Sequence, residues 1–246
     1  MIKLVDIHCH ILPGVDDGSG SFSDSIEMAQ LAASSGIRGI VATPHCNMPD
    51  VFQNHWTLKL QGVLDQLQKE LWARNIPVSL FPGQEIFLAS GFLDLIKQGK
   101  LISMNHSRYL LVEFKPHENA SIALRKLQQI VAEGYVPIVA HPERYGFVQE
   151  YADMVYQMKE LGCLMQINKG SLKGRFGRAA RKCALNILEN YDADFIASDG
   201  HSQYSRTPYL EDAYEIVCER VSSDYADFLL RTNPRKVLKN ERIYIF

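Results

Sequence analysis

Residues 2–18 read IKLVDIHCHILPGVDDG, and the fold prediction starts from this stretch. Its first part, residues 2–7, has the length and the Ile, Leu and Val content of a buried strand. His8 and His10 follow at the carboxyl end of this run, and Asp17 lies in the loop beyond it. An apolar run that ends in imidazole and carboxylate groups is typical of parallel α/β proteins, because their functional groups lie at the carboxyl ends of the strands.

The same pattern recurs along the chain. Seven short apolar runs have strand length and composition: residues 2–7, 39–42, 78–81, 109–114, 136–140, 164–167 and 195–197. Longer stretches with helical periodicity separate them, as at residues 23–35, 54–74, 121–133 and 177–190. Seven strands that alternate with helices predict parallel βαβ units. The simplest arrangement is an α/β fold with one closed or nearly closed barrel, and a doubly wound open sheet is the alternative.

The chain organisation favours one unit. The sequence has 246 residues, of which 46% are hydrophobic and 22% charged, as in ordinary globular proteins. No linker rich in Pro, Gly or Ser divides it, so residues 1–246 are predicted to form a single domain. A final short helix is expected at residues 224–231, with a tail beyond it.

Charge and cysteine content exclude several classes of protein. Lys and Arg number 26 and Asp and Glu 28, so general nucleic-acid binding is not expected, although a local basic patch stays open. No apolar run approaches the roughly 20 residues that span a bilayer, and the first residues do not resemble a signal peptide. A cytoplasmic protein without membrane insertion is predicted. The five cysteines form no C-x-x-C pair, and none precedes an arginine by six positions, as cysteine-dependent phosphatases require.

Six of the seven predicted strands deliver a His, Asp or Glu side chain to the same rim. His8 and His10 are two residues apart, so on an extended segment both imidazoles point the same way and can reach one ion. Asp199 and His201 repeat this spacing after the last strand, which neighbours the first strand in a closed barrel. The candidate metal ligands are His8, His10, Asp17, His45, Glu85, Glu113, His141, Asp199 and His201.

The number and type of these groups indicate the metal content. One catalytic ion needs three or four protein ligands, so nine groups suit two or three ions. Imidazole and carboxylate ligands without thiolate suit Mn²⁺, Zn²⁺ or Fe.

These motifs resemble the PHP (polymerase and histidinol phosphatase) superfamily, and within it the bacterial manganese-dependent tyrosine phosphatases of capsular and exopolysaccharide operons. The similarity runs in order along nearly the whole chain, and DIHCHILP at residues 6–13 and VPIVAHPER at residues 136–144 are its most specific segments. Shorter supporting segments are residues 42–45, 83–86, 107–114, 197–201 and 233–235. The loop at residues 46–52, CNMPDVF, departs from the pattern, since relatives often carry further His, Arg or aromatic residues there.

The resemblance implies a distorted (β/α)7 TIM-like barrel, the PHP fold, with a metal site at the carboxyl ends of the strands. It implies Mn²⁺ as the metal and three sets of ligands. These sets are His8, His10, Glu85 and Asp199 for one ion, Glu85, Glu113 and His141 for a second, and Asp17, His45 and His201 for a third. Arg144 and Arg206 match the positions that the family uses to hold phosphate.

The implied activity is hydrolysis of phosphotyrosine by a hydroxide that bridges metal ions. The implied partner is a phosphotyrosine protein, namely the tyrosine-rich tail of a kinase of polysaccharide export. The nearest alternative is another PHP phosphoesterase, such as a histidinol-phosphate phosphatase. Amidohydrolase-type chemistry and a non-catalytic binding module are further alternatives. No pattern in the sequence encodes the oligomeric state, so a homo-oligomer stays open.

Overall fold

The computed structural model describes residues 3–151 and 153–244. Residue 2 of the first predicted strand and residues 245–246 of the predicted tail lie outside them. The strands are β1 (Leu4–Cys9), β2 (Ile37–Ala42), β3 (His45–Cys46), β4 (Ser79–Pro82), β5 (Glu85–Phe87), β6 (Tyr109–Glu113), β7 (Val136–Ala140), β8 (Leu164–Asn168) and β9 (Phe195–Ala197). The α-helices are α1 (Phe22–Ser34), α2 (Leu58–Ala73), α3 (Phe92–Lys97), α4 (Ala120–Ala132), α5 (Gly146–Glu150), α6 (Met154–Glu160), α7 (Lys169–Leu172), α8 (Gly177–Glu189), α9 (Glu211–Arg220), α10 (Ser223–Asp227) and α11 (Asn233–Leu238). Two 3₁₀ turns, η1 (Met104–His106) and η2 (Pro142–Arg144), and a π-helical segment, η3 (Phe228–Thr232), complete the described elements.

All strand pairs are parallel and fall into two ladders, β1-β2-β4 and β3-β5-β6-β7-β8-β9. β3 follows β2, and β5 follows β4, after gaps of two residues, so the second and third predicted strands, residues 39–42 and 78–81, are each followed by a short strand that was not predicted. Pro44 lies in the first gap and has no N–H to donate to a ladder.

The first and last strands meet at their carboxyl ends. The N–H of His10 donates to the carbonyl of Gly200 over 2.9 Å, and the N–H of Asp199 donates to the carbonyl of His8 over 2.9 Å. Deeper in the barrel, the buried Asp6 carboxylate accepts hydrogen bonds from the N–H and hydroxyl of Ser198. The fold is therefore of the predicted α/β class, a distorted barrel-like arrangement whose two parallel ladders are joined by these contacts between the ends of β1 and β9. These contacts favour a barrel over a doubly wound open sheet.

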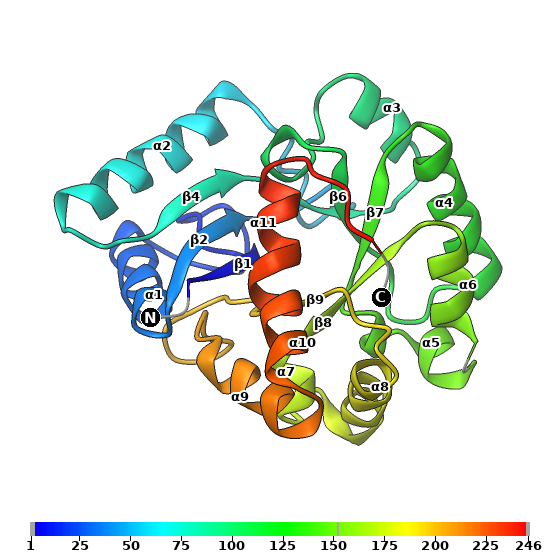
Figure 1. Ribbon diagram of the computed structural model, residues 1–246. Coiled ribbons are helices and arrows are strands. Elements are labelled where there is room, and N and C mark those ends of the chain that lie inside the picture. The colour runs from blue at the N-terminus through cyan, green and yellow to red at the C-terminus, as the bar shows by residue number, and fades with distance from the viewer. Residues whose placement is uncertain (1–2, 152, 245–246) are drawn as a thin grey trace.

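Helices surround the strands, and their boundaries follow capping residues (Figure 1). α2 begins at Leu58 rather than at residue 54 because the Thr57 hydroxyl accepts the N–H of Leu60 over 3.3 Å. α4 is capped in the same way by Asn119. Among the described residues, no helix combines the length and apolar character needed to cross a membrane.

The amino-terminal end of the barrel is covered by α11, which crosses in front of the strands in Figure 1. Asn105 donates to the carbonyl of Leu238 over 2.9 Å, and the Tyr109 hydroxyl donates to the carbonyl of Glu241 over 2.6 Å. Val237 is completely buried in the cluster that fills the barrel. The prediction of a tail beyond residue 231 is therefore wrong at residues 233–238, where the helix gains stability by burying apolar surface against the strands.

The barrel interior is apolar below the carboxyl-terminal rim. Its buried members are Val5, Ile7, Val41, Met104, Tyr109, Leu111, Ile138, Ala140, Leu164, Phe195, Ala197 and Val237. A larger apolar cluster lies between the strands and the surrounding helices. The polar side chains of the predicted site lie above this interior, at the open end of the barrel.

Candidate metal centre

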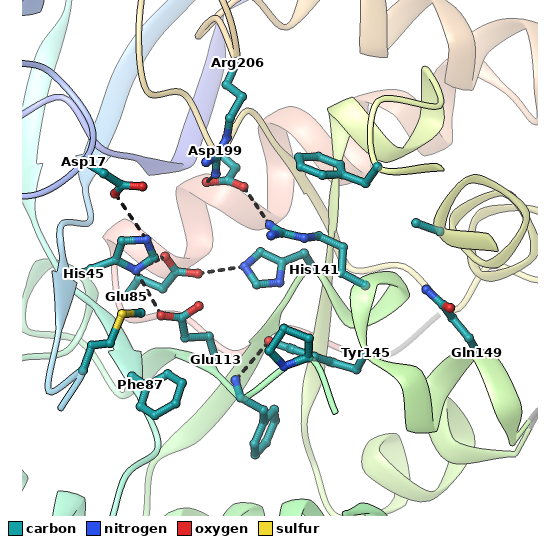
Figure 2. Close-up of a pocket in the computed structure, with 16 residues that line it drawn as sticks. Asp17, His45, Glu85, Phe87, Glu113, His141, Tyr145, Gln149, Asp199 and Arg206 are labelled. Atoms are coloured by element: carbon teal, nitrogen blue, oxygen red, sulfur yellow. Dashed lines mark hydrogen bonds and ion pairs between the residues drawn. The ribbon is translucent and has the colours of Figure 1, made fainter. Parts of the chain in front are cut away.

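The nine predicted ligand residues lie together at the carboxyl ends of the strands. Figure 2 shows Glu85 inside the group, with His45, Glu113 and His141 directed toward it and Asp17 beyond His45. The strands β1, β3, β5 and β6 carry His8, His45, Glu85 and Glu113, and the remaining members follow β1, β7 and β9. Three groups of side chains bring their donor atoms close enough for one ion: His8 with His10 and Glu85, His45 with Glu85 and Glu113, and His10 with Asp17, His45 and His201.

The innermost group is centred on two imidazole nitrogens. The Nε2 atoms of His8 and His10 are 3.2 Å apart. Glu85 Oε2 is 3.2 Å from the first and 3.3 Å from the second, and Asp199 Oδ1 is 3.5 Å from both. All four side chains are buried. They present two nitrogen and two oxygen donor atoms to a common point.

The tautomers of these histidines make the site suitable for a cation. Nδ1 of His8 lies 2.8 Å from Gln166 Oε1, and Nδ1 of His10 lies 2.6 Å from Asp16 Oδ2. Both partners are acceptors, so each Nδ1 carries its proton. In the neutral imidazoles the Nε2 lone pairs then face each other, an arrangement that a proton or a metal ion between them stabilises.

The second group is centred on His45. Its Nδ1 is 3.0 Å from Glu85 Oε2 and 3.0 Å from Glu113 Oε1. His141 Nε2 lies 2.9 Å from the other oxygen of Glu85, so this carboxylate faces four histidines through its two oxygens. Burial is the main cause that raises the pKa of Glu113 to about 7, and repulsion from the Glu85 carboxylate adds to it. Burial would lower the pKa of His45, but the charges of Glu85 and Glu113 raise it to about 12.

The third group lies nearer the solvent. Asp17 Oδ1 is 3.6 Å from His45 Nε2 and 3.5 Å from His201 Nε2. The neighbouring His201 imidazole lowers the pKa of Asp17, while burial opposes that shift. The Asp17 side chain is half-exposed, in contrast to the buried inner ligands. The outermost candidate ion position is therefore the one most open to solvent.

Several buried nitrogen and oxygen atoms that could bind a metal ion have no hydrogen-bond partner among the described residues. They include Glu85 Oε2, His141 Nδ1, Asp199 Oδ1 and His201 Nε2. The short contacts of the two carboxylate oxygens to nitrogen thus lack hydrogen-bond geometry. Unpaired buried polar atoms are costly, and coordination to a cation would satisfy them. The residues present therefore fit a metal centre.

Two residues that support the histidines are missing from the sequence prediction. Asp16 holds Nδ1 of His10, accepts the N–H of His45 over 2.9 Å, and accepts the N–H of Gly18 over 3.0 Å. Gln166, which holds His8, is a completely buried polar residue within the apolar strand β8. A polar residue inside an apolar run is a signal that could have identified Gln166. Asp16 offers no such signal, since it is equally consistent with shaping the turn beside Asp17.

Arg144 and Arg206 flank the same group. Arg206 Nη2 lies 2.5 Å from Asp199 Oδ1, and Arg144 Nη1 lies 3.3 Å from Asp199 Oδ2. The Arg144 guanidinium also stacks on the ring of Phe176, 4.4 Å from its centroid. Arg206 adopts a left-handed backbone conformation with φ of 51°. Non-glycine residues in this conformation cluster at functional sites.

A cleft with a volume of about 450 Å³ opens above the group. Both arginines and most of the candidate ligands line one part of it. The other part is apolar and is lined by Met48, Phe87, Phe114, Pro116, Tyr145 and Phe176. The cleft therefore combines a strongly polar floor with an aromatic wall.

The arrangement is that of the metal-dependent hydrolases built on an α/β barrel. More particularly, residues 4–239 match the family model for capsular polysaccharide synthesis, CpsB/CapC, and the chain belongs to this family. It is 35% identical to the tyrosine-protein phosphatase YwqE of Bacillus subtilis over 241 residues, which cover 98% of this chain and 94% of YwqE. It is 30% identical to the tyrosine-protein phosphatase CpsB of Streptococcus pneumoniae, over 98% of this chain and 100% of CpsB.

Solved structures agree with this placement. A crystal structure from work on YwqE and CpsB, described as unique metal-dependent tyrosine phosphatases, superposes with a TM-score of 0.90 at 35% identity, covering 98% of this chain and 96% of that chain. The phosphotriesterase homology protein of Escherichia coli superposes with a TM-score of 0.61 at 12% identity, over 95% of this chain and 98% of that one. This second similarity concerns the fold alone.

Proposed function

We propose that this protein is a metal-dependent protein-tyrosine phosphatase. The observation that carries the proposal is the presence of an imidazole and carboxylate cluster, two arginines and an aromatic wall in one cleft. Relatives that match the chain over nearly its full length are named tyrosine-protein phosphatases. In this proposal residues 1–246 act as a single domain.

The proposed ligand sets are those that the family resemblance implies, and they overlap with the three groups of side chains, except that His141 takes the place of His45 beside Glu85 and Glu113. One ion is held by His8, His10, Glu85 and Asp199, a second by Glu85, Glu113 and His141, and a third by Asp17, His45 and His201. The position of Glu85 supports a role in bridging two ions, since its Oε2 faces His45 and its Oε1 faces His141. Mn²⁺ is the proposed metal, with Zn²⁺ or Fe as alternatives, because oxygen and imidazole ligands suit these ions.

The chain's own residues bind and orient the phosphoryl group. Bound ions supply Lewis-acid stabilisation of the phosphoryl oxygens and activate water for attack at neutral pH. Arg144 and Arg206 each carry several N–H donors, and a guanidinium can donate two parallel hydrogen bonds to one phosphoryl group. Stacking on Phe176 and the contact with Asp199 hold Arg144 in the cleft before substrate arrives.

The aromatic wall suits the phenyl ring of phosphotyrosine. Phe87, Phe114 and Tyr145 line the cleft beside Glu113 and His141. Offset or edge-to-face contacts with such side chains stabilise a bound ring by roughly 0.5–1.5 kcal/mol per pair. Phe114 and Tyr145 are buried without a ligand, so half-buried Phe87 and Phe176 are the rings that a bound phenyl group would cover. The wall therefore favours phosphotyrosine over phosphoserine.

The thiols offer no alternative nucleophile. Burial raises the pKa of Cys9 and Cys46 well above the usual value and that of Cys163 and Cys183 to about 12. Burial also raises the pKa of the Cys218 thiol. Thiolate is the reactive form of cysteine, and the raised pKa values disfavour it, so these side chains are poor nucleophiles at neutral pH.

Phosphate release from a tyrosine-phosphorylated peptide tests the proposal, measured after chelation and again after addition of Mn²⁺. Histidinol phosphate and a phosphoserine peptide of the same sequence are run beside it. Turnover that returns with Mn²⁺ and is selective for phosphotyrosine is the expected result. Restored turnover on histidinol phosphate alone would move the protein to another branch of phosphoesterases. A protein that binds metal and hydrolyses none of them would be a binding module.

The physiological substrate is proposed to be the tyrosine-rich tail of a kinase of polysaccharide export. The family's connection with capsular polysaccharide synthesis supports this assignment. Cytoplasmic location stays a prediction from the sequence. Dephosphorylation of such a tail by the purified protein is the direct measurement.

A further inference from the structure

A basic segment runs beside the cleft. Residues 169–182 read KGSLKGRFGRAARK and contain six Lys or Arg residues and no Asp or Glu, in a chain whose net charge is −2. The segment covers α7, the loop that follows it, and the first part of α8. It is the local basic patch that the composition left open.

This segment forms one side of a second pocket, which we call the side pocket. It has a volume of about 170 Å³, and its walls include Lys169, Lys173, Arg175, Phe176, Arg206 and Thr207. Phe176 and Arg206 also line the main cleft, so the two cavities are adjacent. A group in the side pocket would lie next to a phosphoryl group held by Arg206.

The shape of the side pocket depends on Gly170. A Cβ atom at this position would lie 2.9 Å from Cε2 of Phe176, closer than real Cβ atoms approach other groups. Glycine therefore lets the ring pack against the backbone of α7. The same ring holds Arg144 through its face, so Phe176 shapes both cavities.

The side pocket has an excess of positive charge. Asp212 is the one acidic residue among its lining residues, and Lys173 Nζ lies 2.5 Å from its Oδ2. Lys169 is buried and directs its ammonium to the hydroxyl of Thr207 and the carbonyl of Tyr209. Arg175 is exposed and has no ion-pair partner among residues 3–151 and 153–244. One carboxylate thus faces three cations besides Arg206, which favours an anionic ligand.

We propose that the side pocket binds an anionic side chain, a carboxylate or a second phosphoryl group, on a residue that flanks the phosphotyrosine of the substrate. This inference rests on the proposed function and specifies the substrate class of the same site. Arg175 is the group that recognises the anion, because its guanidinium is free to donate a pair of hydrogen bonds. The two cavities share Phe176 and Arg206, and an extended peptide advances about 3.3 Å per residue, so the recognised side chain is expected on a residue close in sequence to the phosphotyrosine.

Binding of peptides with a non-hydrolysable phosphonate mimic of phosphotyrosine tests the side pocket without turnover. One peptide has neutral residues at the three positions on each side of the mimic. Related peptides carry a single Glu, or a second mimic, at each of those positions in turn. Dissociation constants are measured by fluorescence anisotropy with the Mn²⁺-loaded protein, and with its Arg175→Ala and Arg178→Ala variants. Arg178 is the matched control, since it is an exposed arginine of the same segment that does not line the side pocket.

The expected result is about tenfold tighter binding of the best anionic peptide, the size of one good hydrogen bond to a charged group. In Arg175→Ala the affinity for the anionic peptide falls most of the way to the affinity for the neutral peptide. Arg178→Ala keeps the preference of the unmodified protein. Comparison of the Glu peptides with the doubly substituted peptides shows which anion is preferred. Equal affinity for anionic and neutral peptides overturns the proposal, as does a preference that Arg175→Ala leaves unchanged.

Hydrolysis of the corresponding phosphotyrosyl peptide is measured separately. Equal affinity of the unmodified protein for anionic and neutral peptides, with normal hydrolysis, rejects the side pocket and leaves the phosphatase proposal intact. An anionic preference that depends on Arg175, without hydrolysis, supports the side pocket and rejects the proposed activity.

Discussion

Asp16 Oδ2 lies 2.6 Å from Nδ1 of His10, and the same oxygen accepts the backbone N–H of His45 over 2.9 Å. One carboxylate oxygen therefore orients two candidate metal ligands that come from different strands. Gly18 completes the arrangement, because a Cβ atom there would lie 2.2 Å from the carbonyl oxygen of His10. Asp16 acts through the histidines and is a positioning residue.

Asp16→Asn is expected to weaken metal binding. The substitution keeps the shape of the side chain but removes the charge that fixes the His10 tautomer, and loss of such partners lowers metal affinity roughly 10- to 100-fold. Titration calorimetry with Mn²⁺ measures the effect. Asp65→Asn, an exposed carboxylate on α2, is the control. Unchanged Mn²⁺ affinity in Asp16→Asn would show that the orientation of His10 does not depend on this contact.

Removal of a central ligand is expected to abolish both metal content and activity. His8→Ala deletes one of the two facing Nε2 atoms and leaves Glu85 and Asp199 without that partner. We expect a fall in turnover of at least about 10³-fold, since both activation of water and charge stabilisation depend on the ions. Metal analysis of the purified protein and phosphate release are measured together. Full activity in His8→Ala would contradict the proposed metal centre.

Arg206→Ala is expected to separate phosphate binding from metal binding. The guanidinium contributes donors to the cleft and is not a metal ligand, so turnover should fall about 10²- to 10³-fold while metal content stays the same. Arg206→Lys should recover little, since an ammonium cannot form two parallel hydrogen bonds. Arg220→Ala, on the exposed face of α9, controls for the loss of one positive charge. A loss of metal in Arg206→Ala would instead assign this arginine to the support of Asp199.

Alkylation is expected to leave activity intact. Cys9, Cys46 and Cys163 are buried, and Cys183 and Cys218 are partly buried, so iodoacetamide at neutral pH meets few accessible thiolates. The double variant Cys183→Ser, Cys218→Ser removes the two partly buried thiols, which iodoacetamide can reach. Phosphate release by this variant should match that of the unmodified protein. A dependence of turnover on either thiol would point to a covalent route.

Asp194, which is not part of the metal centre, is expected to make the free energy of unfolding depend on pH. Burial raises the pKa of Asp194 to about 6, although Lys159 and the hydrogen bond from the Met165 N–H oppose the shift and Asp192 adds to it. The raised pKa means that the native state binds the proton more tightly than the unfolded state. The contribution to stability is therefore present below pH 3.8 and is lost as the pH rises through about 6.

Asp194→Asn tests this contribution, because the amide oxygen can still accept the Met165 N–H. We expect the variant to gain stability relative to the unmodified protein between pH 4 and pH 7, by roughly 3 kcal/mol. Urea unfolding at the two pH values measures the difference, with Asp65→Asn, an exposed carboxylate on α2, as control. A difference that does not change with pH would show that Asp194 is ionised in the native state at pH 4.

The resemblance and the repeated pattern predict the barrel and the position of its site well. The seven apolar runs form the strands, and the residues that follow them meet at one rim. The short strands β3 and β5 were not predicted, because two or three residues are too few to show an apolar strand pattern. The helix α11 was missed because its stability comes from packing under the barrel and its own pattern is short.

The sequence by itself determined the strand and helix alternation, the apolar interior, and the types of group at the carboxyl ends. These follow from local periodicity and from the geometry of parallel strands. Only the tertiary structure decided that Asp16 and Gln166 orient the histidines, that Phe176 holds Arg144, and that Arg175 borders a second pocket. Each of these relationships joins side chains from separate elements. Their distances depend on how the strands and loops pack, and no pattern of neighbouring residues encodes that packing.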